Sequence, residues 1–445
     1  MKKLLIFIFC ISSLFANEEI EVNLSTKQLL YPAYLSKVFN EQSNFDDSYL
    51  EKLFQVLKFD LNSNGFMNLS ENNHQKEFKI SHFDEEISFD QKFWKNQKIA
   101  FVIKPEVNKN SLKISVYNVN NNLLKAFSDI ELTNNLTKDR LKLHSLCDNI
   151  SEIIFGKKGI ASSKILYSIR SKNSETKWQS EIWLCDSDGY NTKKISVKNS
   201  YFVHPLFIPN SVSNDYIYVS YINGQPKLYR SSINNPNQNA QLVKLRGNQL
   251  LPTLSIDGTK LAFISDAAGS PDIFLQHFDH NSLILGKPIQ LFAFPRSTCA
   301  SPSFSPDGTK LAFVSDKDGA PRIYVIKIPE NLYSRKRPIA HLITKKNRQN
   351  VTPSWSKDGK KLAYSAKIDN VRQIWIYDFE KDEEWQLTMG PKNKENPIWS
   401  KNSMHLIYNT EDANEAELYL TNINQKKSIK ITNGEGRKRF PSFEP

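Results

Sequence analysis

Six short segments of this 445-residue chain repeat one pattern, and each segment begins with a proline. Two well-preserved copies read Pro302-Ser-Phe-Ser-Pro-Asp-Gly-Thr-Lys-Leu-Ala-Phe and Pro353-Ser-Trp-Ser-Lys-Asp-Gly-Lys-Lys-Leu-Ala-Tyr. A period of 44 to 51 residues with several strands per unit predicts a β-propeller, whose blades bury their faces against one another. The starting prolines are Pro205, Pro252, Pro302, Pro353, Pro397 and Pro441.

Each repeat has the chemistry of a hairpin. In the copy at Pro302, the side chain of Asp307 can bond to nearby backbone, and Gly308 can take the left-handed conformation that closes a tight turn. The alternating residues at 311–315 then read as a second strand. Segments 322–326 and 341–344 supply a third and a fourth strand, so each unit is predicted to be a four-stranded meander.

The last copy sets the number of blades. Pro441-Ser-Phe begins an inner strand but stops at the end of the chain, whereas segments 164–168, 181–185 and 193–197 supply three strands with no inner strand before them. Together they complete one blade. We therefore predict six blades, with the C-terminal strand pairing beside Ile165-Leu166-Tyr167 and closing the ring without open sheet edges.

The first residues predict export. Lys2 and Lys3 precede an apolar run at 4–14, and Ala16 comes before Asn17-Glu-Glu, which is typical of a signal peptide over 1–16. The apolar run is shorter than the roughly 20 residues that cross a bilayer, and no later segment reaches that length. We expect no transmembrane segment in the mature chain.

Composition narrows the partners. The formal charge is +12, and removal of Lys2 and Lys3 leaves a basic chain. Because the chain is predicted to be exported, its lysines are spread among many loops, and no aromatic-plus-basic strand motif or cysteine-histidine finger occurs, a solvated basic surface is favoured over a nucleic-acid site. Three cysteines remain after processing, an odd and widely spaced set that predicts buried free thiols: Cys147, Cys185 and Cys299.

The period changes before residue 160. Ser48 and Glu51 read as a capping box that opens a helix, and a second helix is expected over 138–155 with Gly156 as its stop. Segments 65–69, 99–103, 112–119 and 123–127 read as strands. The predicted organisation is a flexible segment at 17–33, an α/β domain at 34–158 and a six-bladed propeller at 159–445 that is closed by the C-terminal strand.

Several stretches carry a resemblance to a known family. The helix that starts at Tyr49-Leu-Glu-Lys, the junction that leads into Lys164-Ile-Leu-Tyr, and Phe440-Pro-Ser-Phe at the end resemble the TolB family, the periplasmic components of the Tol-Pal system. The resemblance covers nearly the whole mature chain. The junction residues that match are His144, Asp148, Ile150, Glu152, Gly156 and Gly159.

This resemblance implies a non-enzymatic interaction scaffold located in the periplasm. TolB-like proteins bind the outer-membrane lipoprotein Pal at the mouth of the propeller, and they engage the inner-membrane protein TolA through a flexible N-terminal segment. The corresponding segment here is 17–30, which differs from the family in having little glycine and an acidic start. The implied role is to support outer-membrane integrity and constriction during cell division.

The partner surface follows from the repeat geometry. The loop before each repeat proline joins one blade to the next, so all six loops converge on one mouth of the channel. Matching the Pal-contacting loops of the family by position implies contacts at Asn248, Leu251 and Ala300, with Asn248 standing where the family usually has histidine. Arg348, Arg437 and Lys438 suit an acidic partner, although ordinary solvated charges are the alternative. The full candidate set is Asn248, Leu251, Thr298, Ala300, Arg348, Asn350, Thr352, Arg437 and Lys438.

Two other classes of function stay open: a propeller-based hydrolase or lyase, and a glycan-binding protein. The chain has no Gly-x-Ser-x-Gly elbow, phosphate-binding glycine loop or zinc-protease motif, so we predict no catalytic residue and no cofactor. His277 and His280 lack a third ligand nearby, and no metal site is predicted. Trp355 and Trp399 lie in repeat strands and are expected to be blade core rather than platforms for sugars.

Overall fold

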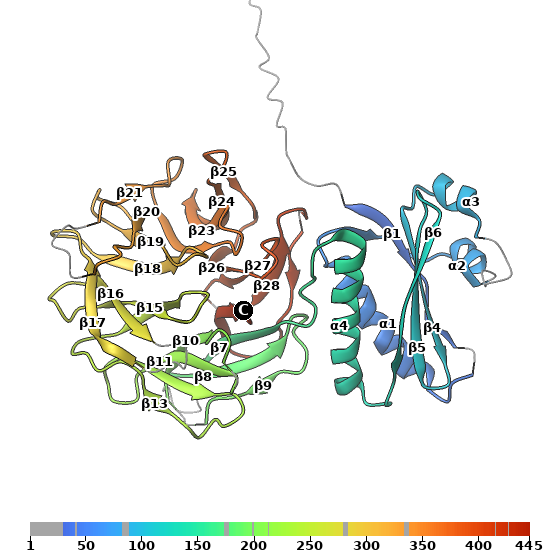
Figure 1. The fold of residues 1–445 in the computed structure, drawn as a ribbon, viewed down its shortest axis with the longest axis horizontal. Coiled ribbons are helices and arrows are strands. Elements are labelled where there is room, and N and C mark those ends of the chain that lie inside the picture. Colours follow the sequence, from blue (N-terminus) through green and yellow to red (C-terminus); the bar gives the residue numbers. More distant parts are fainter. Residues whose placement is uncertain are drawn as a thin grey trace, which may run out of the picture.

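The computed structural model describes residues 30–40, 42–81, 89–172, 178–197, 200–211, 213–278, 284–332, 338–413, 415–425 and 427–445. The predicted signal peptide, residues 17–29 of the predicted flexible segment, and His280 lie outside these residues. Figure 1 shows an α/β domain beside a β-propeller, with helices α1 and α4 between the α/β sheet and the blades.

The N-terminal domain is built on one mixed sheet with the strand order β3-β1-β4-β5-β6. Strand β1 runs parallel to β3 and to β4, the short β2 also pairs with β4, and the β4-β5-β6 part is an antiparallel meander. The elements are β1 (Tyr31–Leu35), β2 (Phe39–Asn40), α1 (Asp47–Asn62), β3 (Met67–Leu69), α2 (His74–Ser81), α3 (Gln91–Asn96), β4 (Phe101–Asn108), β5 (Ser111–Asn118), β6 (Leu123–Glu131) and α4 (Leu136–Phe155).

Helices cover both faces of this sheet. Along β1, the side chains of Ala33 and Leu35 point to one side of the sheet and that of Tyr34 points to the other, because successive side chains of a strand alternate. The Ala33 side packs in one buried cluster with the apolar stripes of α1 and α4. The Tyr34 side packs against Ile80 of α2 and Trp94 of α3 in a second cluster. The α1 and α4 layer is the one that meets the propeller (Figure 1).

The boundaries of this domain correct two predictions. Helix α1 begins at Asp47, and its N-cap is Asp46, whose carboxylate accepts a hydrogen bond from the backbone N–H of Tyr49 at 2.7 Å; the predicted capping box at Ser48 is therefore wrong. Residues 31–33, assigned to the flexible segment, belong to β1. The short elements β2, α2 and α3 were not predicted, whereas the stop of α4 at Gly156, which has φ 71°, is confirmed.

Six four-stranded sheets are found within the described residues, as the repeat predicts. The strands of the first three blades are β10 (Phe202–Phe207), β11 (Asp215–Ser220), β12 (Lys227–Ser232), β13 (Ala240–Gln241), β14 (Leu250–Leu254), β15 (Lys260–Ser265), β16 (Asp272–Phe278), β17 (Ile284–Phe292), β18 (Cys299–Phe304), β19 (Lys310–Ser315), β20 (Arg322–Lys327) and β21 (His341–Leu342). The next two blades contain β22 (Asn350–Trp355), β23 (Lys361–Ile368), β24 (Val371–Asp378), β25 (Glu383–Gln386), β26 (Asn393–Trp399), β27 (His405–Glu411), β28 (Leu418–Asn422) and β29 (Ile429–Lys430).

The sixth blade closes the ring as predicted. Its order is β30 (Arg437–Phe443), β7 (Lys164–Lys172), β8 (Trp178–Asp186) and β9 (Lys193–Lys194), so the C-terminal strand is the inner strand. Phe443 lies opposite Ile165, and Ser442 lies opposite Leu166. The C-terminus therefore lies at the centre of the propeller (Figure 1).

The Asp-Gly segments form the predicted hairpin turns. In the blade that starts at Pro302, the carboxylate of Asp307 accepts a hydrogen bond from the Thr309 N–H at 3.1 Å, and Gly308 has φ 64°. The Ser305 hydroxyl also donates to Asp307, and these hydrogen bonds lower the pKa of Asp307 to about 2. Serine, aspartate and glycine occupy the same turn positions at 255–258 and 356–359, with the same serine-to-aspartate hydrogen bond. The hydrogen bonds to aspartate and the glycine thus fix the turn that joins the first and second strands of each of these blades.

The α/β domain packs against two hairpin turns of the blade formed by β26, β27, β28 and β29. His405 at the start of β27 donates from Nε2 to the carbonyl oxygen of Ser63 at 2.6 Å, and Gln425 donates to the carbonyl oxygen of Asn62 at 2.8 Å. Gly65 has φ 85°, and a Cβ there would lie 3.1 Å from Met404 Cε. Close backbone approach at Gly65 is therefore part of the fit between the domains.

A polar stripe on α4 completes this junction. Arg140, His144 and Asp148 follow one another at intervals of four residues and so share one face of the helix. Arg140 forms an ion pair with Asp188 of the propeller, and Asp148 accepts a hydrogen bond from the N–H of Ala161 at 2.8 Å.

The three thiols predicted to be free, those of Cys147, Cys185 and Cys299, are buried and form no disulfide with one another.

Candidate partner-binding surface

The two ends of the propeller channel differ in the chain segments that form them. Antiparallel strands reverse direction at every turn, so the loops that lead into the six inner strands lie at the end opposite the Asp-Gly hairpin turns. The α/β domain contacts the hairpin-turn end. We call the other end the mouth and define it by the loops 203–204, 248–251, 298–301, 348–352, 393–396 and 434–440.

One backbone feature recurs in every mouth loop. The residue before each repeat proline has a positive φ between 45° and 54°, although none of the six is glycine. The register of each inner strand shifts at the same point, as in a β-bulge. Six different side chains are thus presented by one repeated, strained backbone shape: His204, Leu251, Ser301, Thr352, Asn396 and Phe440.

Most of the predicted contact residues are accessible at the mouth. Thr298 and Arg348 are exposed. The half-buried members are Asn248, Leu251, Ala300, Thr352 and Arg437.

Two predicted contact residues are corrected by their burial. Asn350 and Lys438 have exposed fractions of 0% and 1%, so their side chains are covered in the free protein. Asn350 donates to the carbonyl oxygen of Asn347 at 2.6 Å, and Lys438 contacts Glu417 Oε1 at 3.1 Å. These side chains hold the loops from beneath instead of presenting a surface.

Sequence reasoning missed a regular position behind this burial. The residue three places before each proline is buried in all six blades, and its polar versions hydrogen-bond backbone in or just before the mouth loops. Gln249, for example, donates to the carbonyl oxygens of Val243 and Leu245 at 3.2 and 3.1 Å. The signal was present in the repeat spacing, because the buried residues are Phe202, Gln249, Cys299, Asn350, Lys394 and Lys438.

Carboxylates at the ends of second strands fix two of the candidate residues. Asp266 accepts hydrogen bonds from the backbone N–H of Asn248 at 2.6 Å and from its side-chain amide at 2.7 Å. Asp316, which follows β19, accepts from the Thr298 N–H at 2.7 Å. These loops are therefore held in one conformation before any partner arrives, which lowers the entropy cost of binding.

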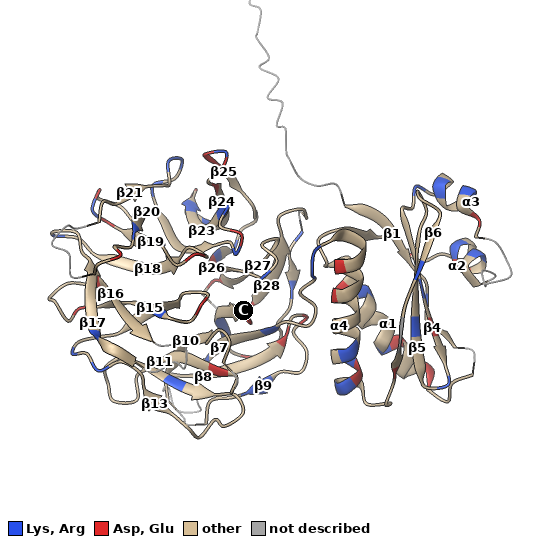
Figure 2. Ribbon diagram, in the orientation of Figure 1, with Lys and Arg blue, Asp and Glu red and all other residues tan. Residues whose placement is uncertain are grey.

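The charges at the mouth are more balanced than the sequence suggested. Arg437 and Arg439 both form ion pairs with Glu411, and Arg372 lies 3.4 Å from Glu395. Burial raises the pKa of Glu395. Figure 2 shows basic and acidic residues interspersed over the blades. Arg437 is therefore part of an internal ion-pair network, whereas Arg348 is an exposed cation.

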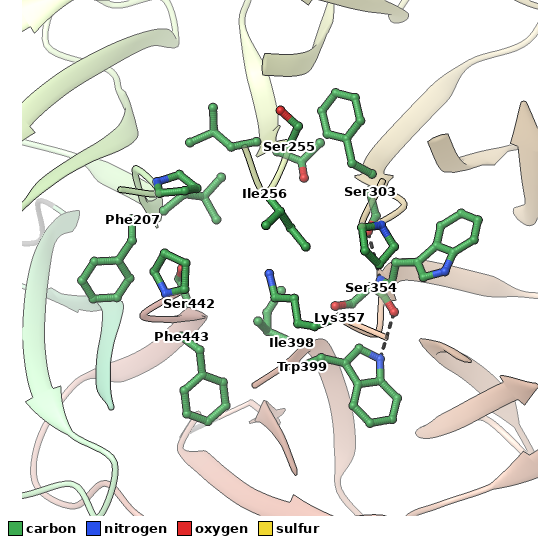
Figure 3. A pocket seen from close by; sticks show the side chains of 18 of the residues that line it. Phe207, Ser255, Ile256, Ser303, Ser354, Lys357, Ile398, Trp399, Ser442 and Phe443 are labelled. Atoms are coloured by element: carbon green, nitrogen blue, oxygen red, sulfur yellow. Dashed lines mark hydrogen bonds between the residues drawn. The ribbon is translucent and has the colours of Figure 1, made fainter. Parts of the chain in front are cut away.

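A cavity of about 170 Å³ lies between the inner strands, toward the hairpin-turn end (Figure 3). Prolines, Ile256 and the tryptophans line it, and the amine of Lys357 points into it. Trp355 and Trp399 are 7% and 1% exposed, and each indole N–H donates to a backbone carbonyl at 3.1 Å. The prediction that both tryptophans belong to the blade core is confirmed.

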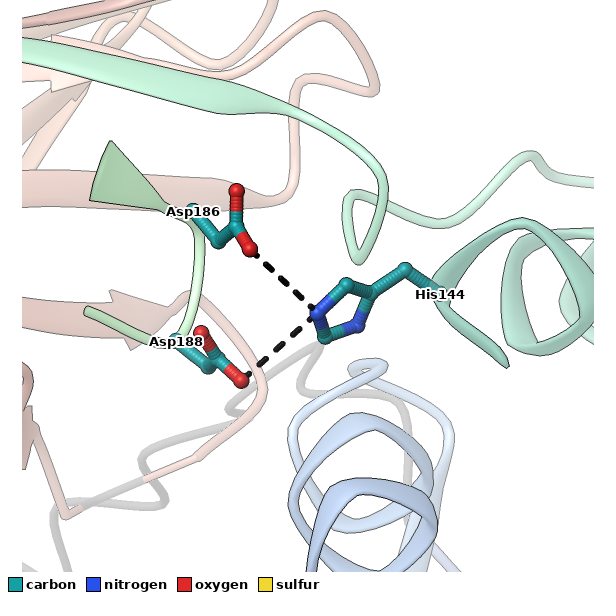
Figure 4. A group of neighbouring side chains, drawn as sticks. All are labelled: His144, Asp186 and Asp188. Carbon is teal, nitrogen blue, oxygen red and sulfur yellow. Dashed lines mark ion pairs between the residues drawn. The ribbon is translucent and has the colours of Figure 1, made fainter. Parts of the chain in front are cut away.

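One group of side chains has the composition of a metal site. His144, Asp186 and Asp188 are buried at the domain junction, with ligand-type atoms within 4.8 Å of one another (Figure 4). Arg140 already pairs with Asp188, and Lys164 already pairs with Asp186. These two cations neutralise the carboxylates, and we assign no metal to this group.

Among the described residues, no helix combines the length and the apolar character needed to cross a membrane.

Comparison with known proteins places the chain in a family. A family model described as the TolB beta propeller domain matches residues 151–445. A protein of Protochlamydia amoebophila named Protein TolB homolog is 44% identical over 384 residues, which cover 85% of this chain and 82% of that protein. The Protein TolB homolog of Chlamydia caviae is 41% identical over 272 residues, or 60% of this chain and 62% of the relative.

A solved structure shows that the whole two-domain fold is shared. The crystal structure of TolB from Acinetobacter baumannii superposes with a TM-score of 0.72 at 19% identity, covering 94% of this chain and 97% of that one. The chain is thus a propeller protein that belongs to the TolB family.

Proposed function

We propose that this protein is a periplasmic scaffold of the Tol-Pal system that binds a Pal-like outer-membrane lipoprotein at the mouth of its propeller. Through this link it supports outer-membrane integrity and constriction during cell division. Family membership supports the choice of partner. The observation that carries the location is the set of six loops with one repeated backbone shape, at the end of the channel away from the α/β domain.

The mouth has the character of a protein-binding surface. It offers a preorganised backbone, an apolar side chain at Leu251 and polar side chains at Asn248, Thr298 and Thr352. Binding energy in such interfaces concentrates in a few central residues, with accessory contacts around them. We assign central contacts to Asn248, Leu251 and Ala300, and peripheral contacts to Thr298, Arg348, Thr352 and Arg437.

A second partner is proposed for the N-terminal segment. Residues 17–30 are assigned to contact a TolA-like inner-membrane protein, on the basis of the family resemblance. Strand β1 begins at Tyr31, whose ring stacks on Phe155 at the end of α4 with a centroid distance of 5.7 Å. The described chain therefore enters β1 beside the end of α4, in the domain that contacts the hairpin-turn end.

A pull-down tests the assignment of the mouth. The mature chain is used as bait in detergent-solubilised envelope, beside a triple variant with Asn248→Ala, Leu251→Arg and Arg348→Glu. We expect a Pal-like lipoprotein to be retained by the parent and lost by the variant, because the new charges and the shortened side chain oppose docking at the mouth. Circular dichroism must show that the variant is folded.

The matched control changes the other end of the channel. Ile256→Arg and Lys360→Glu place charges at the hairpin-turn end, where both residues are exposed. This control variant should retain the lipoprotein. If the parent binds nothing, or if the two variants bind equally well, the mouth is not the Pal site, and the channel becomes the place to screen for glycans.

A further inference from the structure

The domain junction contains a cluster of charged side chains, all buried except half-buried Lys164, whose charges balance only when one histidine carries a proton. We call it the junction cluster: Asp60, Arg140, His144, Lys164, Asp186 and Asp188. The side chain of His144 is 1% exposed, and its Nδ1 lies 2.7 Å from Asp60 Oδ2. Its Nε2 faces Asp188 Oδ2 at 3.7 Å and Asp186 Oδ2 at 4.0 Å, and it makes no hydrogen bond with the described residues (Figure 4).

The cluster spans both domains. Asp60 comes from α1, and Arg140 and His144 come from α4. Asp186 ends β8, Asp188 follows in the turn to β9, and Lys164 begins β7, so these three belong to the propeller. Any charge on His144 therefore acts across the domain boundary.

Each of the propeller carboxylates already has a cation. Arg140 pairs with Asp188, and Lys164 pairs with Asp186. Within the described ranges, Asp60 has His144 as its only charged partner. Two other groups lie close to Asp60 or to the helix face: the Cys147 thiol, whose pKa is raised by burial, and Asp148, which is held by hydrogen bonds from residues 161–162.

The two charge states of His144 differ in how well they fit this setting. A neutral imidazole that donates from Nδ1 to Asp60 would direct the Nε2 lone pair toward two carboxylates and leave the buried cluster with a net negative charge. An imidazolium donates toward both sides and brings the cluster to neutrality. We propose that His144 is protonated in the docked protein and acts as a pH-sensitive lock between the α/β domain and the propeller.

A divalent metal is a poorer fit to the same space. With Arg140 and Lys164 in place, one proton neutralises the three carboxylates, whereas a divalent ion beside neutral His144 would leave an excess positive charge in a buried site. The lock therefore needs no metal. This inference does not depend on the proposed partners.

The sign of the pH dependence follows from what docking adds around His144. Burial lowers the pKa of His144, but its hydrogen bond and attraction to Asp60 and its attraction to Asp188 outweigh burial and raise it. Asp60 lies in the same domain as His144, so its part of the shift remains when the domains separate, whereas Asp188 of the propeller faces Nε2 at 3.7 Å in the docked state. His144 therefore holds its proton more tightly in the docked state, so docking is favoured at acidic pH and weakens as pH rises through the raised pKa of His144.

The chain contains its own control. His405 is also a buried histidine at the domain boundary, but its Nε2–H donates to the carbonyl oxygen of Ser63, and burial lowers its pKa to about 4. It is held neutral above that pH. His144→Gln should therefore remove the pH dependence of docking, whereas His405→Gln should weaken the contact and leave the pH dependence in place.

The test measures the distance between the domains in the mature chain. Nitroxide labels at Leu124→Cys and Met389→Cys, which replace side chains 50% and 80% exposed, report on opposite domains, while the native thiols are buried. Pulsed electron resonance should give a narrow distance distribution at about pH 6 and a broader one at about pH 9. The His144→Gln protein should give the same distribution at both pH values, and His405→Gln should broaden with pH as the parent does.

Nitrogen NMR of labelled histidines tests the charge state without relying on a variant that folds. The imidazole of His144 should be doubly protonated at about pH 7, and EDTA should change neither this signal nor the distance distribution. A neutral His144 at that pH, an equal pH response in His144→Gln, or a response that EDTA abolishes would each overturn the proposal.

Discussion

Residues held in a left-handed conformation define the mouth of the propeller. Thr352 has φ 51°, which is unusual for a β-branched residue, and it directly precedes Pro353. The equivalent residue in every other blade has the same conformation. Since such strain persists only where the surrounding structure determines it, the six bulges are a built feature of this surface.

Replacing the strained residue by glycine should stabilise the protein. Thr352→Gly removes a left-handed cost of about 1–2 kcal/mol, and the greater freedom of glycine in the unfolded chain returns about 0.4–1 kcal/mol. We expect the free energy of unfolding in urea to rise by about 0.5–1 kcal/mol. The control is Ala300→Gly, which lies in another blade, two places before Pro302, and has no positive φ. This change should lower the free energy of unfolding. A loss of stability in Thr352→Gly would show that the site is not strained.

Phe313 is the corresponding test of the blade core. Its side chain is fully buried, and its ring centroid lies 5.3 Å from the ring centroid of Phe292 and 6.0 Å from that of Tyr324. Phe313→Ala should lower the free energy of unfolding by about 3–5 kcal/mol because it leaves a cavity. Met389→Ala, at an 80% exposed site, should change it by less than about 0.5 kcal/mol. A loss below about 1 kcal/mol for Phe313→Ala would contradict the assignment of this ring to the core.

At the scale of elements, the C-terminal strand determines whether the propeller is a closed ring. Strand β30 pairs with β7 and also packs beside the inner strands β10 and β26. Deleting residues 440–445 would expose the edge of β7 and open the ring between two blades. We expect the melting temperature of the whole propeller to fall, and calorimetry should show one transition moving, not a local loss. An unchanged melt would contradict closure by this strand.

Sequence and structure agree where local chemistry decides the outcome. The Asp-Gly turn at 307–308 and the stop at Gly156 were predictable because each depends on residues adjacent in the chain, and the strand at 441–443 was predictable because it repeats the pattern of the other inner strands. The helix cap at Asp46 was missed because Ser48 offered an equally good local pattern. The left-handed conformation at Leu251 was not predictable, since a residue before proline normally favours extended backbone, and only the packing of inner strands imposes the bulge.

The candidate site was predicted in outline but not in detail. The convergence of the mouth loops follows from the repeat, and it places Asn248 and Arg348 correctly at accessible positions. The burial of Lys438 could not be read from its charge, because a lysine in a loop is normally solvated. The pairing of Arg437 with Glu411 joins two different blades and depends on tertiary structure alone.

At the scale of the whole molecule, the two ends of the channel have different roles. The described residues of the α/β domain contact part of the hairpin-turn end, and the junction cluster there is sensitive to pH, whereas the proposed partner binds at the mouth. A partner at the mouth can therefore bind without displacing the α/β domain. This separation concerns where a partner binds, not only whether it binds.

Hydrogen exchange of the full mature chain, with and without the captured lipoprotein, shows at which end of the channel the partner binds. Binding at the mouth predicts slower exchange in the mouth loops at 248–251, 298–301 and 348–352, and unchanged exchange in the hairpin turns at 255–259, 305–309 and 356–360. Protection of the hairpin turns with no change at the mouth would contradict it.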